Sequence, residues 1–166
     1  MPDLVVVAAV IFNDRKQILM AQRAPRGACA GHWEIPGGKV ESGETGEQAV
    51  AREIKEELDL IVDVQDTIAE VTMKPFRRAY TFRVYACSIR DGVPKALAGQ
   101  TALEWIEPLR AINDYVCTLS TYAVYKEVAA YMTACGHCGA YTEGWHDDGY
   151  ALCGHCVAMV EQRDAF

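Results

Sequence analysis

Three glutamates lie close together in one short stretch of the chain and could hold a metal ion. Glu53, Glu56 and Glu57 are spaced i, i+3 and i+4, so in a helix all three carboxylates project from one face. Like charges at these spacings weaken a helix by about 0.2–0.5 kcal/mol per pair. A hard divalent cation such as Mg²⁺ compensates, because it takes oxygen ligands and pairs carboxylates with substrate phosphates. A solvated helix face is the alternative interpretation.

A glycine-rich turn and a fourth glutamate precede this group. Pro36, Gly37 and Gly38 let the backbone turn and approach closely without a β-carbon, which suits carbonyls or amides aimed at a cation or a phosphate. Glu44 follows that turn within the same stretch. The combination favours metal-assisted phosphate chemistry over a plain surface helix.

The elements that must position these residues follow from the hydrophobic pattern. The apolar spacing predicts a helix that begins at Ser42 or Thr45 and runs to about Leu58, and a second helix over 115–132. Strands are predicted over 4–12, 17–22, 33–35, 61–73, 80–89 and 102–106, the third ended by Pro36-Gly37-Gly38. This order indicates an α/β or α+β sandwich layered about one sheet.

The stretch from Gly38 to Leu60 resembles the Nudix box, G-x5-E-x7-R-E-U-x-E-E-x-G-U, where U is aliphatic. The matching positions are Gly38, Glu44, Arg52, Glu53, Ile54, Glu56, Glu57 and Leu60. The preceding Trp-Glu-Ile-Pro-Gly is similar to the segment before the box in MutT-type members. The resemblance implies an α/β/α Nudix sandwich over residues 1–132, with a mixed sheet between helices.

One position departs from the box, because Asp59 stands where glycine is expected. Glycine there normally supplies a left-handed cap just past the helix end. Aspartate tolerates that conformation better than most residues, but its charge opposes the negative end of the helix dipole. We therefore expect a modest cost in stability and an intact carboxylate face.

The resemblance to MutT-type members implies a hydrolase that splits a nucleoside triphosphate into monophosphate and pyrophosphate with Mg²⁺ or Mn²⁺. An oxidised purine such as 8-oxo-dGTP is the first expected substrate, which would make the role nucleotide-pool sanitation, a contribution to DNA repair. A pyrimidine triphosphate, CTP or dCTP, is the second. The alternative to an enzyme is a catalytically idle domain that binds a nucleotide as a sensor. The complete glutamate set favours the enzyme.

The resemblance also implies roles for individual residues. The expected metal ligands are the Gly37 carbonyl and the carboxylates of Glu53, Glu56 and Glu57. Glu53 would also orient or deprotonate the attacking water. Arg52 would hold the glutamates by ion pairing, and Glu44 would brace the loop. Substrate contacts are expected from Arg23, Gly38, Lys39, Arg78 and Ser120.

Two features expected from MutT relatives are missing from this chain. Residues 95–100 carry no carboxylate, although relatives often place a metal ligand or base in this loop. Glu104 is the nearest substitute, or is a solvated strand residue. Residues 116–121 carry no asparagine or aspartate to read the nucleobase, and the Ser120 hydroxyl can donate or accept and so discriminates poorly.

Four cysteines form two C-x-x-C units near the end of the chain. Cys135 and Cys138 are separated from Cys153 and Cys156 by 14 residues, close to the usual spacing of four-cysteine zinc sites. Few aliphatic residues accompany them, so the segment cannot form a sufficient hydrophobic core and needs a bound metal or a disulfide to stabilise it. We expect a zinc-ribbon-like module over 133–166 that binds a structural Zn²⁺. A disulfide pair and a thioredoxin-type redox motif are the alternatives.

The amino-acid composition limits the class of protein and the kinds of partner that can be expected. Among 166 residues, 51% are hydrophobic and 23% are charged, which excludes disordered and fibrous classes. The net charge of −7 argues against duplex DNA and anionic membranes as partners, but not against a small anionic substrate held through a cation. The apolar run Leu4–Phe12 is too short to span a bilayer. A cytoplasmic protein with a nucleotide substrate is expected, and homodimer formation is left open.

Overall fold

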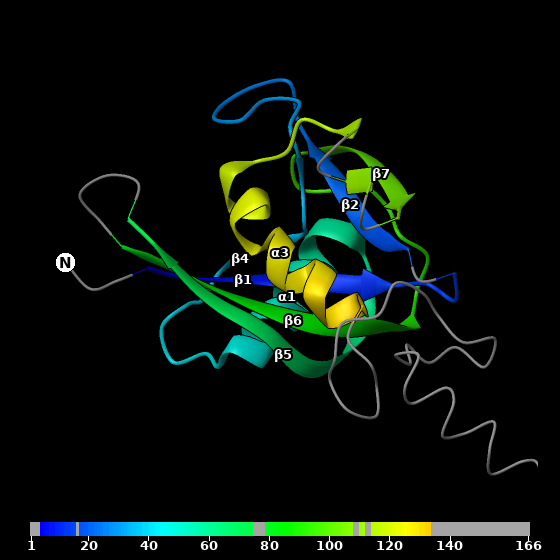
Figure 1. Cartoon of the computed structure of the whole chain (residues 1–166). Coiled ribbons are helices and arrows are strands. Elements are labelled where there is room, and N and C mark those ends of the chain that lie inside the picture. Colours follow the sequence, from blue (N-terminus) through cyan, green and yellow to red (C-terminus); the bar gives the residue numbers. More distant parts are fainter. Residues whose placement is uncertain (1–3, 16, 75–78, 108–109, 112–113, 134–166) are drawn as a thin grey trace, which may run out of the picture. The chain divides into compact units, whose positions relative to one another are not determined.

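The computed structural model describes residues 4–15, 17–74, 79–107, 110–111 and 114–133 (Figure 1). By its internal contacts the chain divides between Tyr125 and Lys126, and the fold around the candidate site lies in the first unit. The proposed boundary near Thr133 stays a prediction, and the proposed zinc module over 134–166 lies outside the described residues. Within the described ranges, no helix is long and apolar enough to cross a membrane.

One mixed sheet forms the centre of the first unit. Its strands are β1 (Leu4–Phe12), β2 (Ile18–Arg23), β3 (Trp33–Glu34), β4 (Gly37–Lys39), β5 (Ile61–Met73), β6 (Tyr80–Asp91) and β7 (Gln100–Ile106). The order is β3-β2-β1-β6-β5, while β4 also pairs with β1 and β7 with β2. The β1–β6 pair is parallel, and the other pairs are antiparallel. The predicted mixed sheet is confirmed.

Helix α1 (Gly46–Leu58) packs on one face of this sheet. It begins after Thr45, whose side chain accepts a hydrogen bond from the amide of Gln48. The Gln48 side chain in turn accepts from the amide of Thr45, which completes a capping box. Its apolar stripe is fully buried at Ala49, Val50, Ile54 and Leu58. These side chains share a core with Val7, Ala9 and Ile11 of β1.

The opposite face of β1 leads to the candidate site. Because strand side chains alternate, Leu4, Val6 and Ala8 point away from α1. They line a cavity together with Ser120 and Thr121 from the start of helix α3 (Leu119–Thr133). The sheet therefore lies between α1 and the first turn of α3, as the sandwich architecture requires (Figure 1).

One strand was missed by the sequence prediction, and one helix start was wrong. Strand β3 ends at Glu34, just before Pro36, as predicted. A further strand then follows, because Gly37–Lys39 forms β4 and pairs with Val6–Ala8 of β1. The last helix begins at Leu119 and not near Tyr115. The preceding residues instead bond to β3, since the Trp33 amide donates to the Val116 carbonyl and the Thr118 amide to the Trp33 carbonyl.

Candidate active site

Strand β4 lies directly against the acidic face of α1. The Gly37 amide donates to Glu57 Oε2 at 3.2 Å. At Gly38, a β-carbon would overlap the carboxylate of Glu53, so only glycine lets the two approach this closely. Gly37 has a φ of 153°, and a β-carbon there would overlap the carbonyl of Val7 in β1. The two glycines thus let a strand pass between β1 and the glutamates.

Arg52 connects the acidic residues to one another. Its Nε lies 2.8 Å from Glu44 Oε1, and its Nη2 donates to Glu44 Oε2 at 3.1 Å and to the Lys39 carbonyl at 2.9 Å. Its Nη1 lies 3.1 Å from Glu53 Oε1 and 3.4 Å from Glu56 Oε2. The Glu44 carboxylate also accepts from the Glu41 amide, which closes the loop between β4 and α1.

These contacts hold the guanidinium and the Glu44 carboxylate in their charged forms. The hydrogen bonds that Arg52 donates to Glu44 raise the pKa of Arg52 most, burial opposes this rise, and the contact with Glu53 adds to it. The Arg52 guanidinium, followed by the Glu41 amide, lowers the pKa of Glu44. The bidentate Arg52–Glu44 pair can therefore fix the loop beside Glu53 without itself exchanging protons.

Glu57 experiences the opposite environment. Burial raises its pKa to about 7, and the charges of Glu34 and Glu53 add to that rise. The Gly37 amide opposes it, and so does a weaker hydrogen bond from Gln100. A buried carboxylate close to other carboxylates is stabilised in its charged form by a cation.

The carboxylates are not gathered into a finished metal site. Among the described residues, no group of three or more His, Cys, Asp or Glu side chains is arranged to hold a metal ion. Glu53 is 16% exposed and faces β4, whereas Glu56 is 58% exposed and reaches toward Arg52. The donor set is nevertheless all oxygen, which suits Mg²⁺, and the mutual repulsion around Glu57 is what such an ion relieves.

Gln100 is a site residue that the sequence did not reveal. It begins β7, and its Nε2 donates to Glu34 Oε1 at 3.3 Å. Its Oε1 is buried with no hydrogen-bond partner among the described residues. An unsatisfied amide oxygen beside two carboxylates is a further potential ligand for a cation or a bound water.

Glu104 does not take the place of the missing loop carboxylate. Its side chain is exposed and accepts from the Tyr115 hydroxyl at 2.6 Å. It is not among the residues that line the cavity. The exposed position of Glu104 favours a solvated strand residue over a metal ligand. The residue that this loop brings to the acidic group is the uncharged Gln100.

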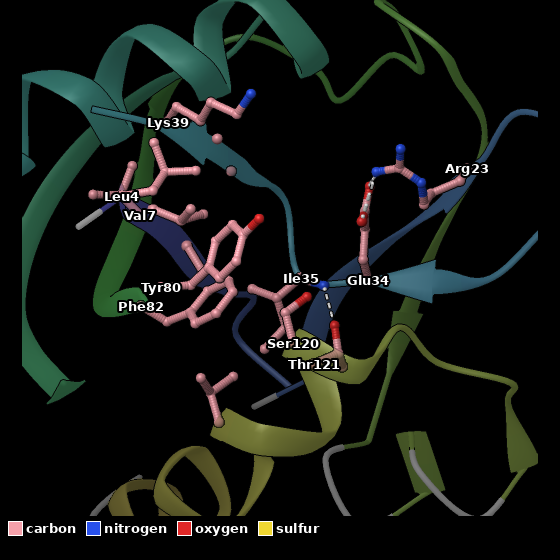
Figure 2. Close-up of a pocket in the computed structure, with 15 residues that line it drawn as sticks. Leu4, Val7, Arg23, Glu34, Ile35, Lys39, Tyr80, Phe82, Ser120 and Thr121 are labelled. Atoms are coloured by element: carbon pink, nitrogen blue, oxygen red, sulfur yellow. Dashed lines mark hydrogen bonds and ion pairs between the residues drawn. The ribbon is translucent and has the colours of Figure 1, made fainter. Parts of the chain in front are cut away.

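A cavity of about 280 Å³ adjoins this acidic group, and Figure 2 shows the residues that line it. Backbone of β4 and the side chains of Arg23, Glu34 and Lys39 supply its polar wall. Tyr80, Phe82 and apolar residues of β1 form another side, and Ser120 and Thr121 lie at the start of α3. Its volume approaches that of small-molecule sites. Its lining residues are Leu4, Val6, Val7, Ala8, Arg23, Glu34, Ile35, Gly37, Gly38, Lys39, Tyr80, Phe82, Ser120, Thr121 and Val124.

The predicted substrate residues are brought together in part. Arg23, Gly38, Lys39 and Ser120 all line the cavity. The Arg23 guanidinium already has partners within the protein, because its Nη1 lies 3.0 Å from both oxygens of Glu34 and its Nε donates to the Ala28 carbonyl. Arg78 lies outside the described residues, as do Cys135, Cys138, Cys153 and Cys156.

Comparison with known proteins agrees with this geometry. Residues 2–114 match the Nudix domain family. The chain is 37% identical over 108 residues to the CTP pyrophosphohydrolase of Escherichia coli, covering 65% of this chain and 78% of that protein. It is 38% identical over 109 residues to a putative 8-oxo-dGTP diphosphatase 2 of Mycobacterium tuberculosis, covering 64% and 74%. A MutT-like protein of Streptomyces ambofaciens is 34% identical over 104 residues, and this match spans 64% of its length and 63% of this chain.

Solved structures give the same picture. The E. coli ORF135 protein superposes with a TM-score of 0.68 at 32% identity, covering 78% of this chain and 91% of that one. The MutT protein of Methanosarcina mazei superposes with a TM-score of 0.67 at 22% identity, covering 76% and 92%. The fold, the acidic face against a double-glycine strand and the domain match lead to one conclusion. This chain belongs to the Nudix hydrolase family.

Proposed function

We propose that this protein is a Mg²⁺-dependent nucleoside triphosphate pyrophosphohydrolase that releases a nucleoside monophosphate and pyrophosphate. One observation carries the proposal: Gly37 and Gly38 contact Glu57 and Glu53 on one side and line the cavity on the other. A nucleotide in this cavity would therefore have its phosphates beside the acidic face of α1. An all-oxygen donor set next to a phosphate chain is typical of magnesium sites.

The metal would be held by Glu53, Glu56 and Glu57 together with the Gly37 carbonyl, and Mn²⁺ could replace Mg²⁺. Bound there, the ion would supply charge neutralisation for the polyphosphate. Glu56 must turn inward from its exposed position to join the others. The orphaned Gln100 Oε1 is a further oxygen available to the ion or its water.

The chain's own residues would perform the remaining tasks. Glu53 would orient the attacking water and accept its proton, and the Arg52 guanidinium would hold the Glu53 carboxylate in place. Glu44 would fix Arg52 through its bidentate pair. The exposed Lys39 and the amides of Gly37 and Gly38 would contact the phosphates, and Arg23 would contact the substrate at the cavity rim.

The nucleobase would enter the apolar part of the cavity. Tyr80 and Phe82 supply aromatic faces for stacking, a contact that every base can make (Figure 2). The names of the relatives point to two substrates, 8-oxo-dGTP and CTP. We place an oxidised purine triphosphate first and a pyrimidine triphosphate second. A cytoplasmic role in clearing damaged nucleotides would follow from the first.

A triphosphate panel with product identification tests the proposal. We expect pyrophosphate release that requires Mg²⁺ and falls by at least about 100-fold in Glu53→Gln. Glu47→Gln is the matched control, because Glu47 lies on the same helix, is exposed and does not line the cavity. Binding of nucleotide without any turnover in the wild-type protein would instead identify a sensor domain. Release of inorganic phosphate alone would contradict the proposed cleavage.

We propose in addition that the C-terminal segment binds a structural Zn²⁺ through Cys135, Cys138, Cys153 and Cys156. The paired C-x-x-C spacing supports this, since four thiolates at such spacing can coordinate zinc tetrahedrally. The zinc would stabilise a segment with few aliphatic residues. No role in the reaction is assigned to it, and self-association is not part of the proposal.

A further inference from the structure

The loop between β6 and β7, residues 92–99, lies against the C-terminal end of α1. The Lys95 amide donates to the Leu58 carbonyl at 3.0 Å, and the Leu97 amide donates to the Glu57 carbonyl at 2.9 Å. Carbonyl groups at a helix end have no partner within the helix itself. Glu57 is therefore held from two sides, because its carboxylate accepts from an amide of β4 while its backbone carbonyl accepts from this loop.

The same loop ends at Gln100, whose side chain reaches the acidic group. Ala98 and Gly99 both have positive φ, 46° and 92°, and a bond from the Gln100 amide back into the loop closes this turn. An alanine in the left-handed region is strained, so the contacts around the turn must hold it there. The Gln100 side chain donates to Glu34 at 3.3 Å and also contacts the Glu57 carboxylate. A displaced loop would therefore disturb two contacts of Glu57 at once.

The Lys95 side chain ties this loop to the helix. Its Nζ lies 2.8 Å from Oδ2 of Asp59, the residue that caps α1 in the left-handed conformation. The other oxygen of Asp59 pairs with Lys55, which belongs to α1 itself and so cannot hold the loop. The start of the loop is equally close to the helix end, because a β-carbon at Gly92 would lie 2.9 Å from the Asp59 carbonyl.

We propose that Lys95 is a positioning residue for metal binding. Its ion pair with Asp59 keeps the loop closed on the end of α1, and the closed loop holds Glu57 and Gln100 in place. The glycine that the Nudix box has at position 59 offers no side chain for such a pair, so the box does not contain this contact. The inference rests on the proposed function, because Glu57 is one of the metal ligands proposed there. An ion that prefers the closed loop must, by linkage, also favour closure.

The expected size of the effect follows from the exposure of the pair. The side chains of Lys95 and Asp59 are 61% and 36% exposed, and a surface ion pair of this kind shifts an equilibrium by about fivefold or less. Local opening of a loop is measurable by amide hydrogen exchange without unfolding the whole domain. The Leu97 amide reports this opening, because its bond to the Glu57 carbonyl forms only when the loop is closed.

The test follows exchange of the Leu97 amide by NMR in the full-length protein, first without metal. Lys95→Gln removes the charge and keeps most of the side chain, so exchange should become about two- to fivefold faster. Lys95→Arg keeps the charge and should exchange like wild type. Lys55→Gln is the matched control, because it removes an equal charge beside the same carboxylate, but the pair that it breaks stays formed when the loop opens. Its Leu97 exchange should stay within about twofold of wild type.

The second arm adds Mg²⁺ to the wild-type protein and so depends on no variant. Titration calorimetry without nucleotide first gives the dissociation constant of the ion. At about ten times that concentration, Leu97 exchange should slow severalfold, with a limit of about tenfold if the closed loop alone binds the ion.

Three results would each overturn the inference: wild-type exchange rates in Lys95→Gln, an equal acceleration in Lys55→Gln, or Mg²⁺ binding that leaves Leu97 exchange unchanged. A wild-type protein that binds no Mg²⁺ would overturn the proposed metal dependence as well. Calorimetry alone reveals that last result, so the two failures are distinguishable.

Discussion

At the scale of single residues, Glu57 combines an energetic cost with a proposed role in metal binding. Its carboxylate is partly buried near Glu34 and Glu53, and this burial raises its pKa to about 7. An acid whose pKa is raised in the folded state destabilises that state once it ionises. The unfolded chain ionises Glu57 near pH 4.5, so stability is lost as the pH rises from 4.5 to about 7 and stays constant above.

Replacement of Glu57 by glutamine should therefore stabilise the metal-free protein. At pH 8 the removed cost is on the order of 3 kcal/mol, so the melting temperature should rise by several degrees. At pH 5 the gain should be much smaller, because the folded wild-type protein is then protonated at this site. Magnesium affinity, measured by calorimetry, should fall in the same variant.

The matched control for this experiment is Glu47→Gln, an exposed change on the same helix. It should show neither the pH-dependent gain in melting temperature nor the loss of magnesium binding. A Glu57→Gln protein that is less stable than wild type at pH 8 without metal would contradict the assignment of repulsion at this site.

Sequence alone was sufficient for residues that lie close together along the chain. The spacing of Glu53, Glu56 and Glu57 places them on one helix face whatever surrounds the helix. Gln100 was missed because its importance comes from contact with Glu34, 66 positions away. The bond from the Ile35 amide to the Thr121 hydroxyl was missed for the same reason, since 86 positions separate these two residues.

At the scale of elements, the end of α1 explains how aspartate replaces the glycine of the Nudix box. Asp59 adopts the left-handed conformation, with φ 56° and ψ 31°, and its amide donates to the Lys55 carbonyl. Its carboxylate pairs with Lys55 and Lys95, which lower its pKa to about 2. The expected unfavourable charge at the helix end is thus neutralised by two lysines.

The same helix end also positions the loop that carries Gln100. The Lys95 amide donates to the Leu58 carbonyl at 3.0 Å, and the Leu97 amide to the Glu57 carbonyl at 2.9 Å. These bonds use carbonyl groups that a helix end leaves unpaired. Asp59 therefore supports both the helix cap and the approach of the loop to the acidic site.

Replacement of Asp59 by asparagine should make the stability of the protein less sensitive to acid. Asparagine also tolerates the left-handed conformation, so the change removes the charge and keeps the cap. The wild-type carboxylate has a lowered pKa, so its stabilising contribution is present above pH 3.8 and disappears as the pH falls toward 2. Urea unfolding should show wild type more stable than Asp59→Asn at pH 7 and both equal near pH 2.

Added salt provides an independent check on Asp59. These side chains are partly exposed, so 1 M NaCl should narrow the difference at pH 7. Asp59→Ala, which strains the left-handed conformation as well, should be less stable than Asp59→Asn at every pH. Equal stability of wild type and Asp59→Asn at pH 7 in low salt would show that the lysine pairs contribute nothing.

Most elements were predictable because their signals are local. The strands Leu4–Phe12 and Ile61–Met73 match their predicted bounds, since apolar or alternating runs of that length leave few other conformations. Strand β4 was not predictable, because Gly37-Gly38 carries no apolar pattern and is extended only through its pairing with β1. The start of α3 was misplaced because the helical period continues upstream, while Trp33 holds residues 116–118 in an extended pairing.

At the scale of the whole molecule, an acidic protein is proposed to bind an acidic substrate. The chain carries a net charge of −7, and several of its carboxylates lie at the end of the cavity that is proposed to hold the phosphates. Diffusion of a triphosphate toward such a surface is opposed until cations occupy the acidic face. The proposed divalent ion would therefore serve substrate binding as well as reaction chemistry.

The division of the chain into two units leads to a prediction about zinc. Every residue that lines the cavity lies within Met1–Tyr125, whereas the four paired cysteines lie beyond it. We expect the purified protein to contain about one equivalent of zinc. The double variant Cys135→Ser/Cys138→Ser should lose that zinc and still hydrolyse nucleotide with Mg²⁺, because no residue of the proposed site has changed.

Cys29→Ser is the matched control for zinc content, since Cys29 is an exposed free cysteine in the first unit. It should keep the full equivalent of metal. Elemental analysis measures the zinc content directly, and pyrophosphate release per mole of protein measures the activity of the proposed nucleotide site. Zinc retained by the double variant would place the metal on other ligands, and turnover lost together with the zinc would show that the second unit supports the first. The expected pattern, metal lost and turnover kept, follows from a cavity built wholly by residues that precede Lys126.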